Sequence, residues 1–138
     1  MQLIDIITNN TEETINLGIR LSKEFKKGDV IGLIGDLASG KTTFVKGILN
    51  GLNYKYEVTS PTFTLINEYD TTIKIIHIDF YREKNIDRWN NLGFHDLINN
   101  DNIVIIEWAD LLLDLLPSDV HMIYFDHMDS GQRRIYSK

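Results

Sequence analysis

The sequence predicts an α/β protein in which a mainly parallel central sheet lies between two layers of helices, with antiparallel strands added at its edge. Short apolar runs typical of buried strands alternate along the chain with longer segments of helical periodicity. The 138 residues fit one domain, residues 1–138, that is long enough to bury a core. An apolar content of 43% and a charged content of 25% are those of an ordinary globular protein.

The first half of the chain is expected to form strand 3–7, helix 11–25, strand 30–34 and helix 41–52. The first helix carries its own start signal. Asn10 is a favoured N-cap residue, and Glu13 follows three residues later, which is the spacing of a capping box. Both helices have one wide apolar face, so each is expected to pack against the sheet.

The second half is expected to be richer in strands. We predict strands 62–69 and 73–79, helical turns between 86 and 99 that break at Gly93, strand 103–106, a short helix 111–116, and a final antiparallel pair, 120–126 and 133–136. The run 103–106 reads Ile-Val-Ile-Ile and is the most apolar of these strands. It is therefore expected near the centre of the sheet.

Residues 35–42 read Gly-Asp-Leu-Ala-Ser-Gly-Lys-Thr and match the complete phosphate-binding loop pattern, G-x-x-x-x-G-K-[ST]. Glycines let the backbone approach a phosphate, and the following helix offers N–H groups and its positive dipole end. Lys41 is expected to reach the β- and γ-phosphates, and Thr42 to bind Mg²⁺. The loop predicts ATP with Mg²⁺ as the ligand and a P-loop NTPase-like three-layer α/β/α sandwich. The predicted nucleotide-binding residues here are Gly35, Asp36, Leu37, Ala38, Ser39, Gly40, Lys41, Thr42 and Thr43, the last being either a second hydroxyl near the phosphates or an ordinary helical residue.

Two strands end in an acidic residue, and a P-loop enzyme needs such an acid for its Mg²⁺ shell and its water. Asp79 ends one strand and Glu107 ends the most apolar one. Either could also be a surface acid that only terminates a strand. We predict Glu107 as the metal-shell acid with Thr42, and Asp79 as an acid near the γ-phosphate or its water; the direct Mg²⁺ contact stays open between the two acids. The predicted catalytic residues are thus Lys41, Asp79 and Glu107.

Three further features have both a functional and a plain structural interpretation. The loop residues Ser60, Pro61 and Thr62 either form a switch that senses the γ-phosphate or an ordinary turn. His77 shares a strand face with Asp79, so a metal pair is conceivable, but a structural histidine is favoured because no third ligand is visible. For Trp108, the residues alone favour packing over chemistry.

Composition and missing motifs exclude several functions. The absence of cysteine removes thiol catalysis, disulfides and thiolate metal sites, and it fits a reducing compartment. The net charge of −6, without a dense Lys/Arg run, argues against strong independent binding of tRNA or other nucleic acid. No Asn-Lys-x-Asp element for guanine is present, which disfavours a GTPase. Residues 1–8 have no basic start, and no apolar run approaches the length of a bilayer span, so we expect a cytoplasmic protein.

Four motifs in order resemble the bacterial TsaE family, the ATPase component of tRNA threonylcarbamoyladenosine biosynthesis. They are Gly-Asp-Leu-x-x-Gly-Lys-Thr-Thr at 35–43, Ser-Pro-Thr-Phe at 60–63, His-Ile-Asp-Phe-Tyr-Arg at 77–82, and Glu-Trp at 107–108. The resemblance runs over nearly the whole chain. It departs from the family at Ala38-Ser39, where Gly-Ala is more usual; Ser39 still supplies a small side chain and an N–H.

The resemblance implies an activity and partners. The protein would bind ATP, hydrolyse it slowly alone, and act with two partner proteins that transfer a threonylcarbamoyl group to the adenosine beside the anticodon. ATP use would support turnover or resetting of that complex. The same resemblance implies that Glu107 is the second Mg²⁺ contact, that Trp108 lies beside the site, and that Thr11 approaches the nucleotide. Arg133, in the C-terminal basic stretch, completes the candidate nucleotide-binding residues.

Three functions remain to be distinguished. The leading hypothesis is an ATPase subunit of a tRNA-modification complex. A small-molecule kinase would need an acceptor pocket and an arginine-bearing lid, and neither is clear in the sequence. A nucleotide-gated binding module would bind ATP tightly without turnover, even beside partners.

Overall fold

The computed structural model describes residues 2–36, 38–58, 64–98 and 101–138. Its strands are β1 (Asp5–Thr8), β2 (Val30–Gly35), β3 (Ile66–Tyr69), β4 (Lys74–Asp79), β5 (Asn102–Glu107), β6 (His121–His127) and β7 (Arg133–Ser137). Its helices are α1 (Thr11–Ser22), α2 (Lys41–Gly51), α3 (Ile86–Asn91) and α4 (Phe94–Leu97), with 3₁₀ turns η1 (Ala109–Leu115) and η2 (Asp129–Gly131).

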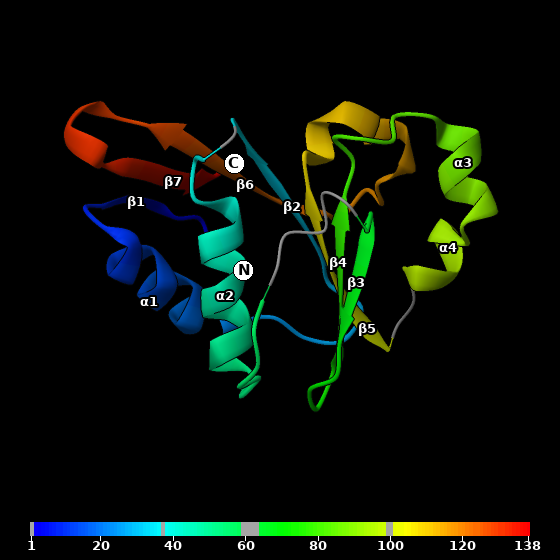
Figure 1. Ribbon diagram of the computed structural model, residues 1–138, viewed down its shortest axis with the longest axis horizontal. Coiled ribbons are helices and arrows are strands. Elements are labelled where there is room, and N and C mark those ends of the chain that lie inside the picture. The colour runs from blue at the N-terminus through cyan, green and yellow to red at the C-terminus, as the bar shows by residue number, and fades with distance from the viewer. Residues whose placement is uncertain (1, 37, 59–63, 99–100) are drawn as a thin grey trace.

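All seven strands form one sheet in the order β1-β7-β6-β2-β5-β4-β3 (Figure 1). The four central strands β6, β2, β5 and β4 pair in parallel, whereas β3 is antiparallel to β4, and β7 is antiparallel to both β6 and β1. The predicted parallel centre is confirmed, and β5 does lie near the middle with every residue buried. The antiparallel additions occur at both edges of the sheet. The predicted C-terminal pair is present, and its first strand also extends the parallel centre.

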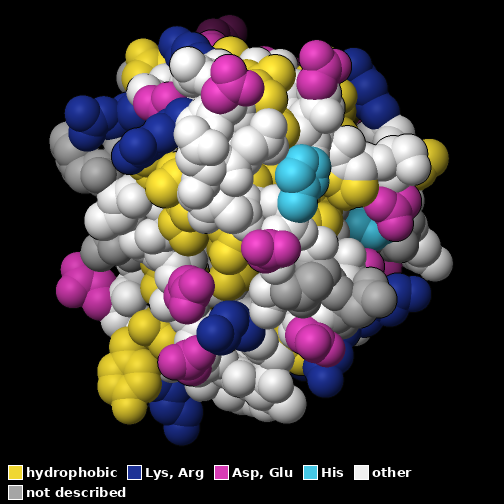
Figure 2. Space-filling view, turned by 90° about the vertical axis from the view of Figure 1, so that its right-hand side faces the viewer, with side chains coloured by type: hydrophobic (Ala, Val, Ile, Leu, Met, Phe, Trp, Pro, Cys, Tyr) yellow, Lys and Arg dark blue, Asp and Glu magenta, His cyan; other side chains and the backbone are white. Residues whose placement is uncertain are grey.

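Helices cover both faces of the sheet. Figure 1 shows α1 and α2 on one side and α3 and α4 on the other. Alternate strand residues divide between the two layers: Ile75, Ile103 and Ile105 pack with α1 and α2, whereas Ile76 and Val104 belong to the core under α3 and α4. Acidic, basic and polar side chains are interspersed over the outer face of the α3–α4 side (Figure 2).

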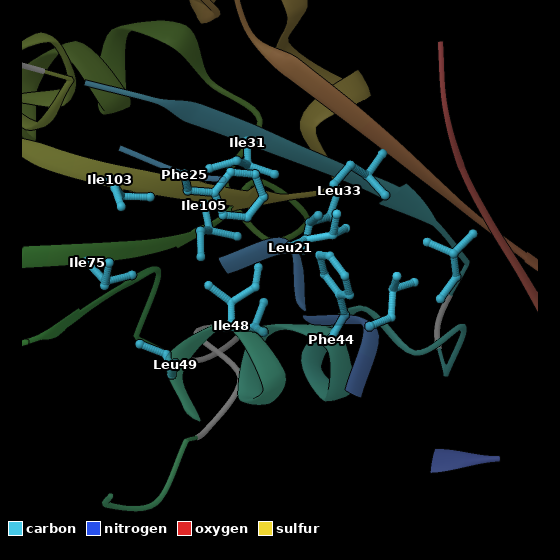
Figure 3. Close-up of a cluster of buried hydrophobic side chains, with 14 of the residues drawn as sticks. Leu21, Phe25, Ile31, Leu33, Phe44, Ile48, Leu49, Ile75, Ile103 and Ile105 are labelled. Carbon is cyan, nitrogen blue, oxygen red and sulfur yellow. The ribbon is translucent and has the colours of Figure 1, made fainter. Parts of the chain in front are cut away.

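The α1–α2 layer is unusually close-packed because small residues face each other. Gly18 and Gly47 lie where the helices touch: a Cβ added to Gly47 would collide with the carbonyl oxygen of Ile15, and one added to Gly18 would lie 2.5 Å from that of Phe44. Phe44 and its neighbours then fill the space below the sheet (Figure 3). This packing brings the first turn of α1 beside the first turn of α2.

Several element boundaries differ from the predicted ones. Helix α1 ends at Ser22, before the expected residue 25, and β3 begins only at Ile66 because Leu65 takes a left-handed backbone with φ +68°. In place of the predicted helix 111–116, the structure has the 3₁₀ segment η1, which is kinked at Leu112, where the dihedral angles are not helical. The expected break at Gly93 is confirmed, as this residue separates α3 from α4. Residues 62–63 of the predicted strand 62–69 lie outside the described residues. In the part of the chain described, no helix is long and apolar enough to cross a membrane.

Candidate nucleotide-binding site

A pocket of about 500 Å³ opens where the first turns of α1 and α2 meet the carboxyl ends of β4 and β5. It is lined by Asn10, Thr11, Thr14, Ala38, Ser39, Gly40, Lys41, Thr42, Thr43, Asp79, Glu107, Trp108, Gly131 and Arg133. Ligands of parallel α/β sheets bind beyond the carboxyl ends of the strands, which is where this pocket lies. Most of the predicted site residues therefore meet in one cavity.

The loop before α2 is shaped to receive an anion. Ala38 and Gly40 both have positive φ, at 61° and 104°, and Gly40 is the residue from which the helix starts. Gly40 has no side chain that could cap the first turn, and Lys41, Thr42 and Thr43, which form the start of the helix, line the pocket. Helix N-termini of this kind bind phosphate through their N–H groups and the helix dipole.

Lys41 is folded back into the loop. Its ammonium group donates a hydrogen bond to the carbonyl oxygen of Gly35 and lies 3.7 Å from the ring centroid of Trp108. Burial lowers the pKa of Lys41, against the attraction of Glu107, Asp79 and other acids, which acts to raise it. The ammonium is therefore poorly solvated for a charged group. An incoming phosphate would supply the compensating negative charge.

The two predicted acids lie side by side because parallel pairing of β4 with β5 sets Asp79 opposite Glu107. Both are buried, with 2% and 4% of their surface exposed. The Thr42 hydroxyl lies 3.4 Å from each carboxylate oxygen of Glu107. One carboxylate oxygen of Asp79 accepts a hydrogen bond from the N–H of Tyr81 at 2.7 Å. Thr42 and Glu107 thus form the hydroxyl–carboxylate pair that the sequence predicted, and Asp79 stands next to it.

His77 pairs with Glu107 and not with Asp79, the acid that shares its strand face. Its Nε2 lies 2.6 Å from Oε2 of Glu107, on the neighbouring strand. The described residues contain no group of three or more His, Asp or Glu side chains arranged to hold a metal ion. A protein-only metal cage around His77 and Asp79 therefore has no support in the part of the chain described.

Trp108 is both packed and part of the pocket wall. Its backbone is left-handed, with φ +58°, which is uncommon for a bulky residue and costs conformational energy. The indole ring contacts the Lys41 ammonium on one side and the ring of Tyr81 on another, where the two ring centroids lie 4.8 Å apart. One of the left-handed residues thus lies directly after Glu107, in the pocket wall.

A family model described as "Threonylcarbamoyl adenosine biosynthesis protein TsaE" matches residues 8–135. The chain belongs to the TsaE family. Proteins named tRNA threonylcarbamoyladenosine biosynthesis protein TsaE are similar to it over most of their length. The one from Bacillus subtilis (strain 168) is 37% identical over 129 residues, which are 93% of this chain and 80% of the relative. The one from Aquifex aeolicus (strain VF5) is 36% identical over an alignment of 144 positions that covers 100% of both chains.

The fold agrees with this membership. The crystal structure of Bacillus subtilis YdiB superposes with a TM-score of 0.85 at 32% identity, covering 99% of this chain and 84% of that chain. The α/β architecture typical of P-loop NTPases and the resemblance to the TsaE family are thus both confirmed. The TsaE family, to which the chain belongs, is a family of tRNA threonylcarbamoyladenosine biosynthesis proteins.

Some predicted site residues lie elsewhere. Gly35 and Asp36 are described but do not line the pocket; Gly35 instead accepts the hydrogen bond of Lys41, and an added Cβ there would lie 2.7 Å from Ser39 Oγ. Leu37 and the switch residues Ser60, Pro61 and Thr62 lie outside the described residues. For these four, the predicted roles stay predictions.

The pocket wall also contains residues that the sequence did not single out as site residues. Asn10, Thr14 and Gly131 join Thr11 and Arg133 there. A guanidinium nitrogen of Arg133 donates to the carbonyl oxygen of Ala38 at 3.3 Å, which ties the β6–β7 hairpin to the phosphate-binding loop. Asn10 was visible only as an N-cap, and no motif marks the other two. The packing of α1 against α2 places Asn10 and Thr14, whereas Gly131 reaches the pocket from the β6–β7 hairpin.

Proposed function

We propose that this chain binds ATP with Mg²⁺ and hydrolyses it as the cytoplasmic ATPase component of the threonylcarbamoyladenosine modification of tRNA. Membership of the TsaE family supports the process. The single observation that supports the chemistry is the cluster of Lys41, Thr42, Asp79 and Glu107 in one pocket at the start of α2. Each of these four groups has a role that phosphoryl transfer to water requires.

The donor set fits Mg²⁺ that arrives with a nucleotide. Mg²⁺ prefers oxygen ligands, keeps several waters, and is usually held by one or two carboxylates together with substrate phosphates. One hydroxyl (Thr42) and one carboxylate (Glu107), 3.4 Å apart, match this pattern. Bound there, the ion would neutralise charge on the β- and γ-phosphates.

Hydrolysis requires water oxygen to attack the γ-phosphorus while the bond to the β–γ bridging oxygen breaks, giving ADP and inorganic phosphate. The N–H groups at the start of α2 and the ammonium of Lys41 would hold the phosphate oxygens. Asp79, which accepts a hydrogen bond from the Tyr81 N–H, would orient the attacking water and accept its hydrogen bond.

Slow turnover alone is the natural expectation. Arginine donors stabilise the charge of the phosphoryl transition state in fast P-loop enzymes. Among the described residues, Arg133 is the arginine that lines the pocket, and its guanidinium is engaged with backbone carbonyls of Gly131, Gln132 and Ala38. We therefore propose that two partner proteins of the threonylcarbamoyl-transfer complex stimulate hydrolysis, and that tRNA is touched only indirectly or weakly.

Nucleotide specificity and turnover of the isolated chain test the chemical part of this proposal. ATP, ADP and GTP are titrated with and without Mg²⁺ by calorimetry, and phosphate release is followed in parallel, with Lys41→Ala as the blank. Tight binding of adenine nucleotides and weak, Lys41-dependent turnover are expected. Phosphorylation of an added nucleoside or sugar in place of phosphate release would instead indicate a kinase. Binding with no release, even with partners, would indicate a nucleotide-gated module.

A further inference from the structure

We propose that His77 is a positioning residue: it holds the Glu107 carboxylate against Thr42, and so sets the Mg²⁺-dependent part of nucleotide binding and turnover. This inference rests on the proposed ATP and Mg²⁺ site. His77 itself does not line the pocket, so it acts through Glu107.

The placement of His77 follows from strand alternation and register. Ile75, His77 and Asp79 share one face of β4, the face toward α1 and α2, as shown by Ile75 in that core. Parallel pairing sets His77 opposite Ile105, two residues before Glu107 on the same face of β5. The His77 ring therefore lies diagonally below the Glu107 carboxylate, at the 2.6 Å hydrogen-bond distance.

His77 is a costly residue for this position unless it serves Glu107. Its side chain is 0% exposed, on a strand face where Ile75 is also fully buried. Its Nδ1 has no hydrogen-bond partner in the described part of the chain. An isoleucine or leucine here would bury apolar surface without leaving a nitrogen unpaired. The hydrogen bond to Glu107 is the contact that accounts for an imidazole in this core.

The tautomer follows from the same contacts. Because Oε2 of Glu107 is an acceptor, Nε2 carries the proton and donates it. In the neutral ring Nδ1 then keeps a lone pair, and an unpaired acceptor is tolerated better in a core than an unpaired N–H. The Nε2–H bond fixes one oxygen of the carboxylate, while Thr42 contacts both.

Fixing Glu107 also keeps it from Lys41. The two groups attract each other, since Glu107 acts to raise the Lys41 pKa. Glutamate has a flexible side chain, and without His77 its carboxylate could swing to the ammonium and compete with the phosphates for it. In the described structure the carboxylate pairs with His77 and Lys41 turns to Gly35 and Trp108. Ligand-orienting groups of this kind typically change metal affinity or activity by ~10–100-fold when they are removed.

Two substitutions separate positioning from simple packing. His77→Leu removes the donor but keeps an apolar side chain of similar size. His77→Gln carries an amide N–H at the same number of bonds from Cα as Nε2 and can restore the donor. ADP affinity is measured by calorimetry in Mg²⁺ and in EDTA, together with thermal unfolding and the kcat and KM of ATP hydrolysis.

We expect His77→Leu to unfold at or above the wild-type temperature and to lose less ADP affinity in EDTA than in Mg²⁺. The Mg²⁺-dependent gain in ADP affinity and kcat should each fall ~10–100-fold, and His77→Gln should recover most of both. Equal Mg²⁺-dependent gains in ADP affinity in wild type and His77→Leu would overturn the role of His77 but not the proposed metal site. Equal losses in His77→Leu and His77→Gln would also overturn it. If Mg²⁺ does not change the ADP affinity of the wild-type protein, the proposed metal site is wrong, and so is the proposed role of His77.

Discussion

Burial of the Lys41 ammonium disfavours folding, and a bound phosphate would offset that cost. Lys41 is almost fully buried, 4% exposed, and burial lowers the pKa of its ammonium against the attraction of Glu107 and Asp79. The folded protein thus carries a cation that it solvates poorly. A bound triphosphate would supply the negative charge that the ammonium lacks. We therefore expect Lys41 to stabilise the nucleotide complex more than the free protein.

Replacing this cation separates stability from binding. Lys41→Met keeps the length and apolar stem of the side chain but removes the buried charge. Because the folded state disfavours the ammonium, we expect a thermal midpoint equal to or a few degrees above wild type, while ATP affinity falls by at least ~10-fold. Calorimetric unfolding and ATP titration of both proteins measure the two effects. A marked loss of stability would contradict the view that burial dominates the Lys41 environment.

Glu107 and Asp79 lie next to each other but are expected to act differently. Glu107→Gln keeps the shape and an oxygen toward Thr42 but lowers the charge available to Mg²⁺. We expect it to lose most of the Mg²⁺-dependent gain in ADP affinity. Asp79→Asn is the matched control: it should keep that gain and lose turnover, because we propose that Asp79 orients the attacking water. The reverse pattern would exchange the two roles, which the sequence left open.

At the scale of elements, the site depends on how closely two helices approach. Gly47 on α2 and Gly18 on α1 let the backbones touch, and this contact sets the first turn of α1, with Thr11 and Thr14, beside the phosphate-binding loop. A hydrogen bond of 2.8 Å between the hydroxyls of Thr8 and Thr14 ties β1 to the same turn. The part of the pocket beside the first turn of α1 is therefore built by helix packing and not by any local motif.

Gly47→Ala tests this contact. Alanine is the better helix former and would stabilise an exposed helix by about 1 kcal/mol relative to glycine. Here its Cβ collides with the Ile15 carbonyl, so we expect a net loss of about 1–3 kcal/mol in the free energy of unfolding. Asn50→Ala, on the exposed side of α2, is the control and should change stability by less than about 0.5 kcal/mol. Stabilisation by Gly47→Ala in a denaturant titration would show that the helices can separate freely.

Much of the element order could be predicted because local signals and the fold agree. The run 103–106 predicted a central strand, Gly93 predicted a break, and the loop 35–42 predicted the start of α2, where the structure has each. The errors arose where tertiary contacts override local pattern. No spacing in the sequence reveals that His77 would meet Glu107 across two strands, or that Thr14 and Gly131 would line the pocket.

At the scale of the whole molecule, charge limits what the chain does by itself. The net charge is −6, and the face shown in Figure 2 mixes acidic and basic groups. Binding of nucleic acid draws most of its affinity from clustered cations at phosphates. The membership of a tRNA-modification family is therefore best reconciled with action through partner proteins.

Direct binding of tRNA is accordingly expected to be weak. Fluorescence anisotropy of labelled tRNA, titrated with the chain alone at physiological ionic strength, should show no binding below about 10 μM. Adding the two partner proteins should produce a complex whose tRNA affinity comes from them. A salt-sensitive, submicromolar affinity of the isolated chain would show instead that the chain itself carries a basic surface that binds tRNA.

The central claim is that this chain is an ATPase that its partners stimulate. Phosphate release from Mg²⁺-ATP tests it most directly, measured for the chain alone, for the two partners alone and for all three, with Lys41→Ala replacing the chain in a parallel series. We predict slow release alone, a rise of at least ~10-fold, about 1.4 kcal/mol of transition-state stabilisation, with the partners, and no rise with Lys41→Ala. Release that the partners leave unchanged, or that Lys41→Ala retains, would contradict the claim.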